Sequence, residues 1–172
     1  MKKFFKFGCL GIVAIFAILV VIMIIDIAND DPKTKEKPKE TVTTTAKWQE
    51  KIKEVASSNK SPNEKFDEVS KYAHDYKPSK DEVKQFGDAI IKEYKDKDKN
   101  YIKDISNHEY MLTNIFKSQV VDRNAPEKPL KDFAFDFWQN SKYNYRGVEN
   151  ATSSATQANE RQMDKSLSKM NK

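Results

Sequence analysis

The strongest hydrophobic pattern in the chain is an uncharged run from Phe7 to Ile25. It is nineteen residues long, and thirteen of these are Leu, Ile, Val or Phe. At about 1.5 Å of rise per residue, a helix of this length covers nearly the whole hydrocarbon core of a bilayer. Each such side chain favours insertion by roughly 0.3 to 0.6 kcal/mol near the centre of a span. The pattern therefore predicts a single N-terminal transmembrane helix within residues 1–28.

The charges that flank this run predict its orientation. Lysines precede it and aspartates follow it: Lys2, Lys3 and Lys6, then Asp26, Asp30 and Asp31. The positive-inside bias places the N-terminus in the cytoplasm and the C-terminal domain outside the cell. A cleaved secretory signal is the alternative, but its apolar region runs about 7 to 15 residues and ends in a small-x-small site. We expect the span to be retained as a single-pass signal-anchor in the cell membrane.

Cys9 raises the further alternative of lipid attachment. A bacterial lipoprotein is processed at a Cys that ends its apolar region, whereas Cys9 comes before the apolar run, with Lys6 where an apolar residue is expected. The opening Met-Lys-Lys-Phe-Phe-Lys-Phe-Gly-Cys-Leu-Gly-Ile nevertheless resembles the anchors of small exported proteins of low-GC Gram-positive bacteria, many of them labelled lipoproteins of unknown function. The resemblance covers about the first 25 residues and implies the compartment only.

Residues 29–45 have the pattern of a charged stalk. The segment carries two Pro, alternating charges, several Thr and a single apolar residue, Val42. Such a composition cannot bury enough apolar surface to fold. We expect it to hold residues 46–172, the extracytoplasmic domain, away from the lipid surface.

Apolar residues in the rest of the chain recur at helical spacing. Trp48, Ile52 and Val55 predict a helix over about 46–56. Two capping boxes, Ser61 with Glu64 and Ser79 with Glu82, predict the starts of the next two helices. The expected buried residues of these two helices are Phe66, Val69, Ala73 and Tyr76, then Val83, Phe86, Ile90 and Tyr94.

The Lys and Asp residues at 95–99 are interpreted as a break, although a solvated stretch inside one helix is the alternative. A long helix is then expected from Tyr101 through Ile105 to Val120, closing before Asp122. Pro129 starts another, which Gly147 ends. The last helix is expected to bury an Ala-rich seam: Val148, Ala151, Ala155, Ala158, Gln162, Ser166 and Met170, with Met163 and Leu167 beside it.

The fold class that follows is all-α, a small irregular bundle of about five helices. The only period-two run is Phe133, Phe135 and Phe137, and one short strand would have nothing to pair with. No Cys follows Cys9, so no disulfide can hold an exported domain. The domain must therefore fold by packing alone.

Charge argues against nucleic acid as a partner. The whole chain has a net charge of +5, of which about +2 belongs to the anchor. The remainder is too small for a nucleic-acid footprint. The basic residues outside the anchor are nearly all Lys, which indicates solvation.

Chemistry-bearing residues are few. His74 and His108 lack the second His or the Cys that a zinc site needs, so both are interpreted as solvated, and no metal or cofactor is expected. There is no Gly-rich turn to expose a nucleophile. Asp132 and Asp136 lie one helical turn apart and could serve a glycan hydrolase, but acids are so abundant that most such pairs are surface charge.

The aromatic segment is the strongest candidate for function. Phe133 and Phe137 share a helix face and are expected in the core with Leu130, whereas Phe135 falls on the other side. Tyr, Trp and Arg are the residues that dominate binding hot spots. The candidate partner-binding residues are Phe135, Trp138, Tyr143, Tyr145 and Arg146. The alternative is that so small a bundle buries all of these aromatic residues as core.

These observations predict a membrane-tethered extracytoplasmic interaction module, anchored through Phe7 to Ile25. Immunity, phage exclusion or a secretion-accessory role would suit this architecture, with another envelope protein as the partner. A cell-envelope enzyme such as a glycan hydrolase is the alternative. A wall-polymer or nucleic-acid-binding helper is a third, which steep salt dependence of binding would reveal.

Overall fold

The computed structural model describes residues 41–96 and 100–170, and every regular element in them is helical. The predicted span Phe7–Ile25 and residues 29–40 of the predicted stalk lie outside these residues. The elements are α2 Thr41–Ser57, α3 Pro62–Asp75, α4 Lys80–Asp96, the 3₁₀ turn η1 Asn100–Ile102, α5 His108–Asn124, α6 Lys128–Tyr145 and α7 Ser154–Met170. The all-α prediction is confirmed, with six α-helices in these ranges instead of about five.

No helix within 41–96 or 100–170 combines the length and the apolar character that a membrane crossing requires.

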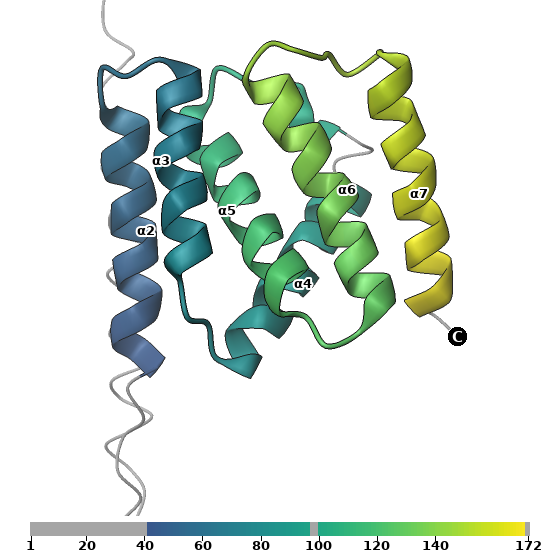
Figure 1. Ribbon diagram of the computed structural model, residues 1–172, viewed down its shortest axis with the longest axis horizontal. Coiled ribbons are helices and arrows are strands. Elements are labelled where there is room, and N and C mark those ends of the chain that lie inside the picture. Colours follow the sequence, from purple (N-terminus) through teal and green to yellow (C-terminus); the bar gives the residue numbers. More distant parts are fainter. Residues whose placement is uncertain (1–40, 97–99, 171–172) are drawn as a thin grey trace, which may run out of the picture. The chain divides into compact units, whose positions relative to one another are not determined.

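Helix α5 forms the centre of the bundle. In Figure 1, α2 and α3 lie on one side of it and α6 on the other, with α7 beside α6 and α4 behind. Because α5 is covered on several sides, its apolar residues point in several directions, and Met111, Leu112, Ile115, Phe116, Val120 and Val121 are all buried. The outermost helix in this order, α7, packs mainly against α6.

Both predicted capping boxes are confirmed. The Ser61 amide donates to Glu64 Oε2 at 2.9 Å, and Ser61 Oγ accepts from the Glu64 amide at 3.4 Å. At the start of α4, the Ser79 amide donates to Glu82 Oε2 at 2.9 Å, and the Glu82 amide donates to Ser79 Oγ at 3.2 Å. Each box satisfies amides that a helix start leaves without partners.

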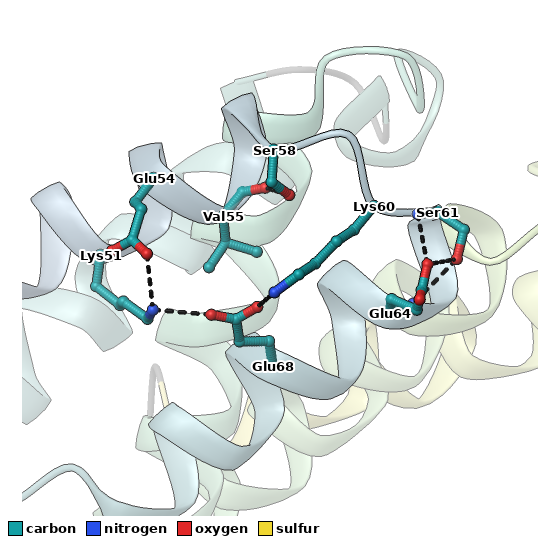
Figure 2. Close-up of polar contacts among 8 residues, drawn as sticks. All are labelled: Lys51, Glu54, Val55, Ser58, Lys60, Ser61, Glu64 and Glu68. Atoms are coloured by element: carbon teal, nitrogen blue, oxygen red, sulfur yellow. Dashed lines mark hydrogen bonds and ion pairs between the residues drawn. The ribbon is translucent and has the colours of Figure 1, made fainter.

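A lysine–glutamate cluster joins α2 to α3, as Figure 2 shows. Glu68 of α3 accepts from Lys51 Nζ of α2 at 2.8 Å and from Lys60 Nζ in the connecting loop. The two lysines hold the pKa of the Glu68 carboxyl below its usual value. Because these side chains are partly exposed, such pairs contribute little to stability and mainly orient the two helices.

Helix α2 begins five residues earlier than the predicted start at Ala46, so Thr41–Thr45, assigned to the stalk, belong to the helix. Its predicted inward residues Trp48, Ile52 and Val55 are all buried. The pattern of Thr residues alone gave no helix signal, because Thr has modest helix propensity.

The predicted long helix from Tyr101 is wrong. The chain makes the short turn η1 there, which buries Tyr101 and Ile102, while Ile105 is 44% exposed. Helix α5 starts only at His108, where the Asn107 side chain accepts from the Tyr110 amide at 3.1 Å. It also continues through Asp122 to Asn124. The apolar spacing across η1 mimicked a helical stripe, and the Asn107 cap was not recognised.

The ends of the last two helices show one success and one error. Helix α6 carries Pro129 in its first turn and is followed by Gly147 at φ 70°, as predicted. The seam of α7 agrees only in part with the expected one: Met163 and Ser166 are buried as predicted, but Thr156 is buried as well and Val148 is 61% exposed. Buried amides of α6 select this register, since Asn144 Nδ2 donates to Thr156 Oγ1 at 3.2 Å.

Candidate partner-binding surface

The aromatic segment of α6 is divided by side, as its spacing predicts. Phe133 and Phe137 are fully buried, whereas Phe135 is 43% exposed. Phe133 packs edge-on against Tyr94 with ring centroids 5.6 Å apart, and Phe137 stacks on Tyr101 at 4.5 Å. Two phenylalanines of the helix therefore belong to the core, and the third lies at the surface, where a partner molecule could cover it.

Phe135 lines a groove between α6 and α7. This α6–α7 groove has a volume of about 530 Å³ and is lined by Asp122 of α5, by Asp132, Phe135 and Asp136 of α6, and by Gln162 and Ser166 of α7. Four lysines line it as well: Lys128, Lys131, Lys165 and Lys169. The groove thus surrounds one aromatic ring with charges of both signs.

The carboxylates of the groove differ in their surroundings. Asp132 accepts from Lys128 Nζ at 2.7 Å. Burial raises the pKa of Asp136 to about 6, and the nearby Asp132 charge adds to the rise. Burial also raises the pKa of Asp122, although Lys131 and Arg123 oppose it. Asp136 therefore ionises with more difficulty than an ordinary surface carboxylate.

Trp138 and Tyr143 form a second part of the surface, around Lys142. The Lys142 Nζ atom lies 4.6 Å from the centroid of the Trp138 ring and 4.7 Å from that of Tyr143. Trp138 also neighbours Phe135, with ring centroids 6.1 Å apart. These two predicted partner-binding residues therefore already make cation–π contacts with Lys142 of the same chain, which the sequence analysis did not predict.

Arg146 ties the end of α6 to the start of α3. Its Nε donates to Asn63 Oδ1 at 2.7 Å, and its guanidinium carbon lies 5.2 Å from the Phe66 ring centroid. An exposed cation–π contact of this kind contributes about 0.5 to 1 kcal/mol. The residue is only partly exposed and has an intramolecular role.

Tyr145 does not belong to the surface. It is 3% exposed, and its Oη lies 3.0 Å from His108 Nδ1. Tyr145, one of the candidate partner-binding residues, therefore lies in the core, and its truncation would open a cavity and leave the His108 ring without this partner. The interpretation of His108 as solvated fails for the same reason: the ring is partly buried, and burial lowers its pKa, with a smaller contribution from Lys65.

His74 lies on the surface beside Asp75, with Nδ1 3.0 Å from Oδ1. Within the described ranges, no three His, Cys, Asp or Glu side chains are arranged so that they could hold a metal ion. Comparison of the chain with protein-family models, with curated proteins and with solved structures finds no match. The surface is therefore interpreted from its own geometry.

The sequence identified the α6 half of this surface and missed the α7 half. Gln162 and Ser166 were assigned to the packing seam of the last helix, and both line the groove. Which residues face α6 depends on the buried amide contacts that set the register of α7, and no spacing rule reports those contacts.

Proposed function

We propose that this protein is a membrane-tethered, extracytoplasmic interaction module that binds another envelope protein through the groove side of α6. The proposed anchor is the Phe7–Ile25 run, with the helical domain outside the cell. Of the residues first proposed for recognition, Phe135 is the central contact and Trp138 its neighbour, with Tyr143 further along α6 and Arg146 directly after its end.

The observation that carries this proposal is the exposure of Phe135. An aromatic ring that is 43% exposed, set in a groove beside half-buried charge, has the features of a binding hot spot. The two nearby phenylalanines of α6, Phe133 and Phe137, are fully buried, whereas the Phe135 ring is not part of the core packing.

Site-specific photo-crosslinking in intact cells tests the proposal. The photoreactive amino acid p-benzoylphenylalanine, placed at position 135 of the full chain, should give a discrete adduct with one envelope protein. The matched control is the same amino acid at Lys92 of α4, whose side chain is 76% exposed. Adducts at both positions would indicate random collisions, and no adduct at position 135 would contradict the proposal.

The glycan-hydrolase alternative has one observation in its favour. Asp136, whose pKa is raised to about 6, and Asp132 line the same groove, and a general acid of a glycosidase has a raised pKa. Against it, side chains one turn apart on one helix approach a ligand from the same side, whereas a glycosidase flanks the scissile bond. Release of reducing sugars from purified cell wall, abolished in Asp136→Asn, would establish the enzyme.

A further inference from the structure

Asp136 is a half-buried carboxylate that has no counter-ion among the residues the structure describes. Its neighbour Asp132 holds Lys128, but no Lys or Arg nitrogen in the described part of the chain lies within ion-pair distance of Asp136. Burying a charge without a partner is costly, and native proteins usually avoid it. A cation that reached Asp136 from outside would remove that cost.

Ser166, across the groove on α7, is a second group without a partner. It is 4% exposed and lines the groove, and among the described residues its Oγ has no hydrogen-bond partner. The Oγ atom is open to the groove and not fully enclosed by protein, so it can accept a hydrogen bond from a group that enters the groove. The two helices therefore present to the same groove a carboxylate and a hydroxyl that no other described residue pairs with.

Phe135 completes the set of groups. It lines the same groove and offers an exposed aromatic ring one residue before Asp136. A planar guanidinium can stack on such a ring while its N–H groups donate to a carboxylate and a hydroxyl. An ammonium group lacks the flat face and the fork of donors, so it would use fewer of these groups.

The lysines of the groove restrict the ligand further. Lys128, Lys131, Lys165 and Lys169 outnumber the three carboxylates, so a ligand with several positive charges would be repelled. A segment with a single arginine flanked by acidic residues is complementary to both the carboxylates and the lysines of the groove.

We propose that the α6–α7 groove binds one arginine side chain of a partner protein, with Asp136 as its counter-ion, Ser166 as a hydrogen-bond acceptor and Phe135 as the stacking surface. The flanking residues of the bound segment are acidic and meet the groove lysines. The inference rests on the proposed function and specifies the chemistry that the partner must present.

Capped peptides and the full chain in detergent micelles test the inference. The probe is acetyl-Glu-Arg-Glu-amide, and the comparison peptides replace Arg with citrulline, its neutral isostere, or with Lys. Binding is followed by NMR of the protein with ¹³C-labelled Asp carboxyls. The arginine peptide should shift the Asp136 signal saturably in the millimolar range and move its titration midpoint to lower pH, while the citrulline peptide should do neither.

Variants assign the contacts. Asp136→Asn should weaken binding of the arginine peptide at least tenfold, and Ser166→Ala should weaken it several-fold. The control Asp88→Asn, at an exposed carboxylate of α4, should leave the affinity unchanged. The amide spectrum of each variant shows whether it is folded. Equal binding of the citrulline peptide, equal binding of the lysine peptide, or unchanged binding by folded Asp136→Asn would each overturn the inference. Crosslinking at position 135 would still report on the proposed function, so the two can fail separately.

Discussion

At the scale of single residues, aromatic rings alternate between buried and exposed positions along α6, so residues that stabilise the fold can be tested separately from those proposed for recognition. Phe133→Ala removes a fully buried ring, so it should lower the free energy of unfolding by about 3 to 5 kcal/mol. Phe135→Ala removes a ring that is already 43% exposed, and should cost less than about 1 kcal/mol. Chemical denaturation of both variants measures the difference. Equal losses would mean that Phe135 is a core residue and that the proposed surface is misplaced.

Asp136 makes a second prediction at this scale. Its pKa is raised from 3.8 to about 6, so the folded state binds the proton more tightly than the unfolded state. The contribution of this group to stability is therefore present below about pH 4 and is lost as pH rises through about 6. The free energy of unfolding of Asp136→Asn should equal that of the parent near pH 4. Near pH 7 it should be about 1 kcal/mol larger than that of the parent, after allowance for solvent screening.

Thermal melts of the parent and of Asp136→Asn across this pH range check the prediction. Asp88→Asn, at an exposed carboxylate paired with Lys84, is the control, and its melting temperature should stay close to that of the parent because exposed ion pairs contribute little to stability. Because burial also lowers the pKa of His108 below its ordinary value, the informative quantity is the difference between variant and parent. A variant that is less stable than the parent near pH 7 would show that the Asp136 charge has a favourable partner.

At the scale of elements, the two helix starts that carry a capping box were predictable, whereas the connections were not. Ser61 with Glu64 and Ser79 with Glu82 are local signals, because the cap and its partner lie three residues apart. The failure at η1 is of the opposite kind. Tyr101 is fixed by Phe137 and Asn140, residues far along the chain, so the local spacing of apolar residues carried no information about it.

The α7 half of the groove was unpredictable for the same reason. Asn140 Nδ2 of α6 donates to the Thr156 carbonyl at 3.0 Å, and Asn159 Nδ2 of α7 donates to Asn140 Oδ1 at 2.7 Å. A polar contact of this kind sets the register of a helix whose apolar stripe is thin. The sequence shows the amides but does not show which carbonyl each one reaches.

This network leads to a prediction for α7. Asn140→Ala would leave the Tyr101 Oη and the Thr156 carbonyl without this donor inside the protein, at a cost of about 2 kcal/mol or more. The loss should fall mainly on the docking of α7, which packs chiefly on α6. Hydrogen exchange should therefore accelerate more in α7 than in the central helix α5.

The control for this experiment is Asn63→Ala, the same change at an exposed residue that accepts from Arg146. It should leave exchange in α7 unaltered. If Asn140→Ala instead accelerates exchange in α5 and α7 equally, α7 opens only with the whole domain, and the network is not a local docking device.

At the scale of the whole molecule, the proposed function depends on which side of the membrane the helical domain occupies. Lysines before Phe7 and aspartates after Ile25 predict an internal N-terminus and an external domain. In protoplasts treated with protease, an epitope tag at the C-terminus should be lost and a tag at the N-terminus should stay in the membrane fraction. A cytoplasmic marker protein that remains intact shows that the membrane is sealed.

The same preparation distinguishes the alternatives for the anchor. If the apolar run were a cleaved signal, the N-terminal tag would separate from the domain before any protease is added. If Cys9 carried a lipid that retained the chain, Cys9→Ser would release the domain from the membrane fraction, whereas a retained span predicts no change. Protection of the C-terminal tag in intact protoplasts would place the α6–α7 groove inside the cell. That result would contradict an envelope partner, because the groove and its partner must share a compartment.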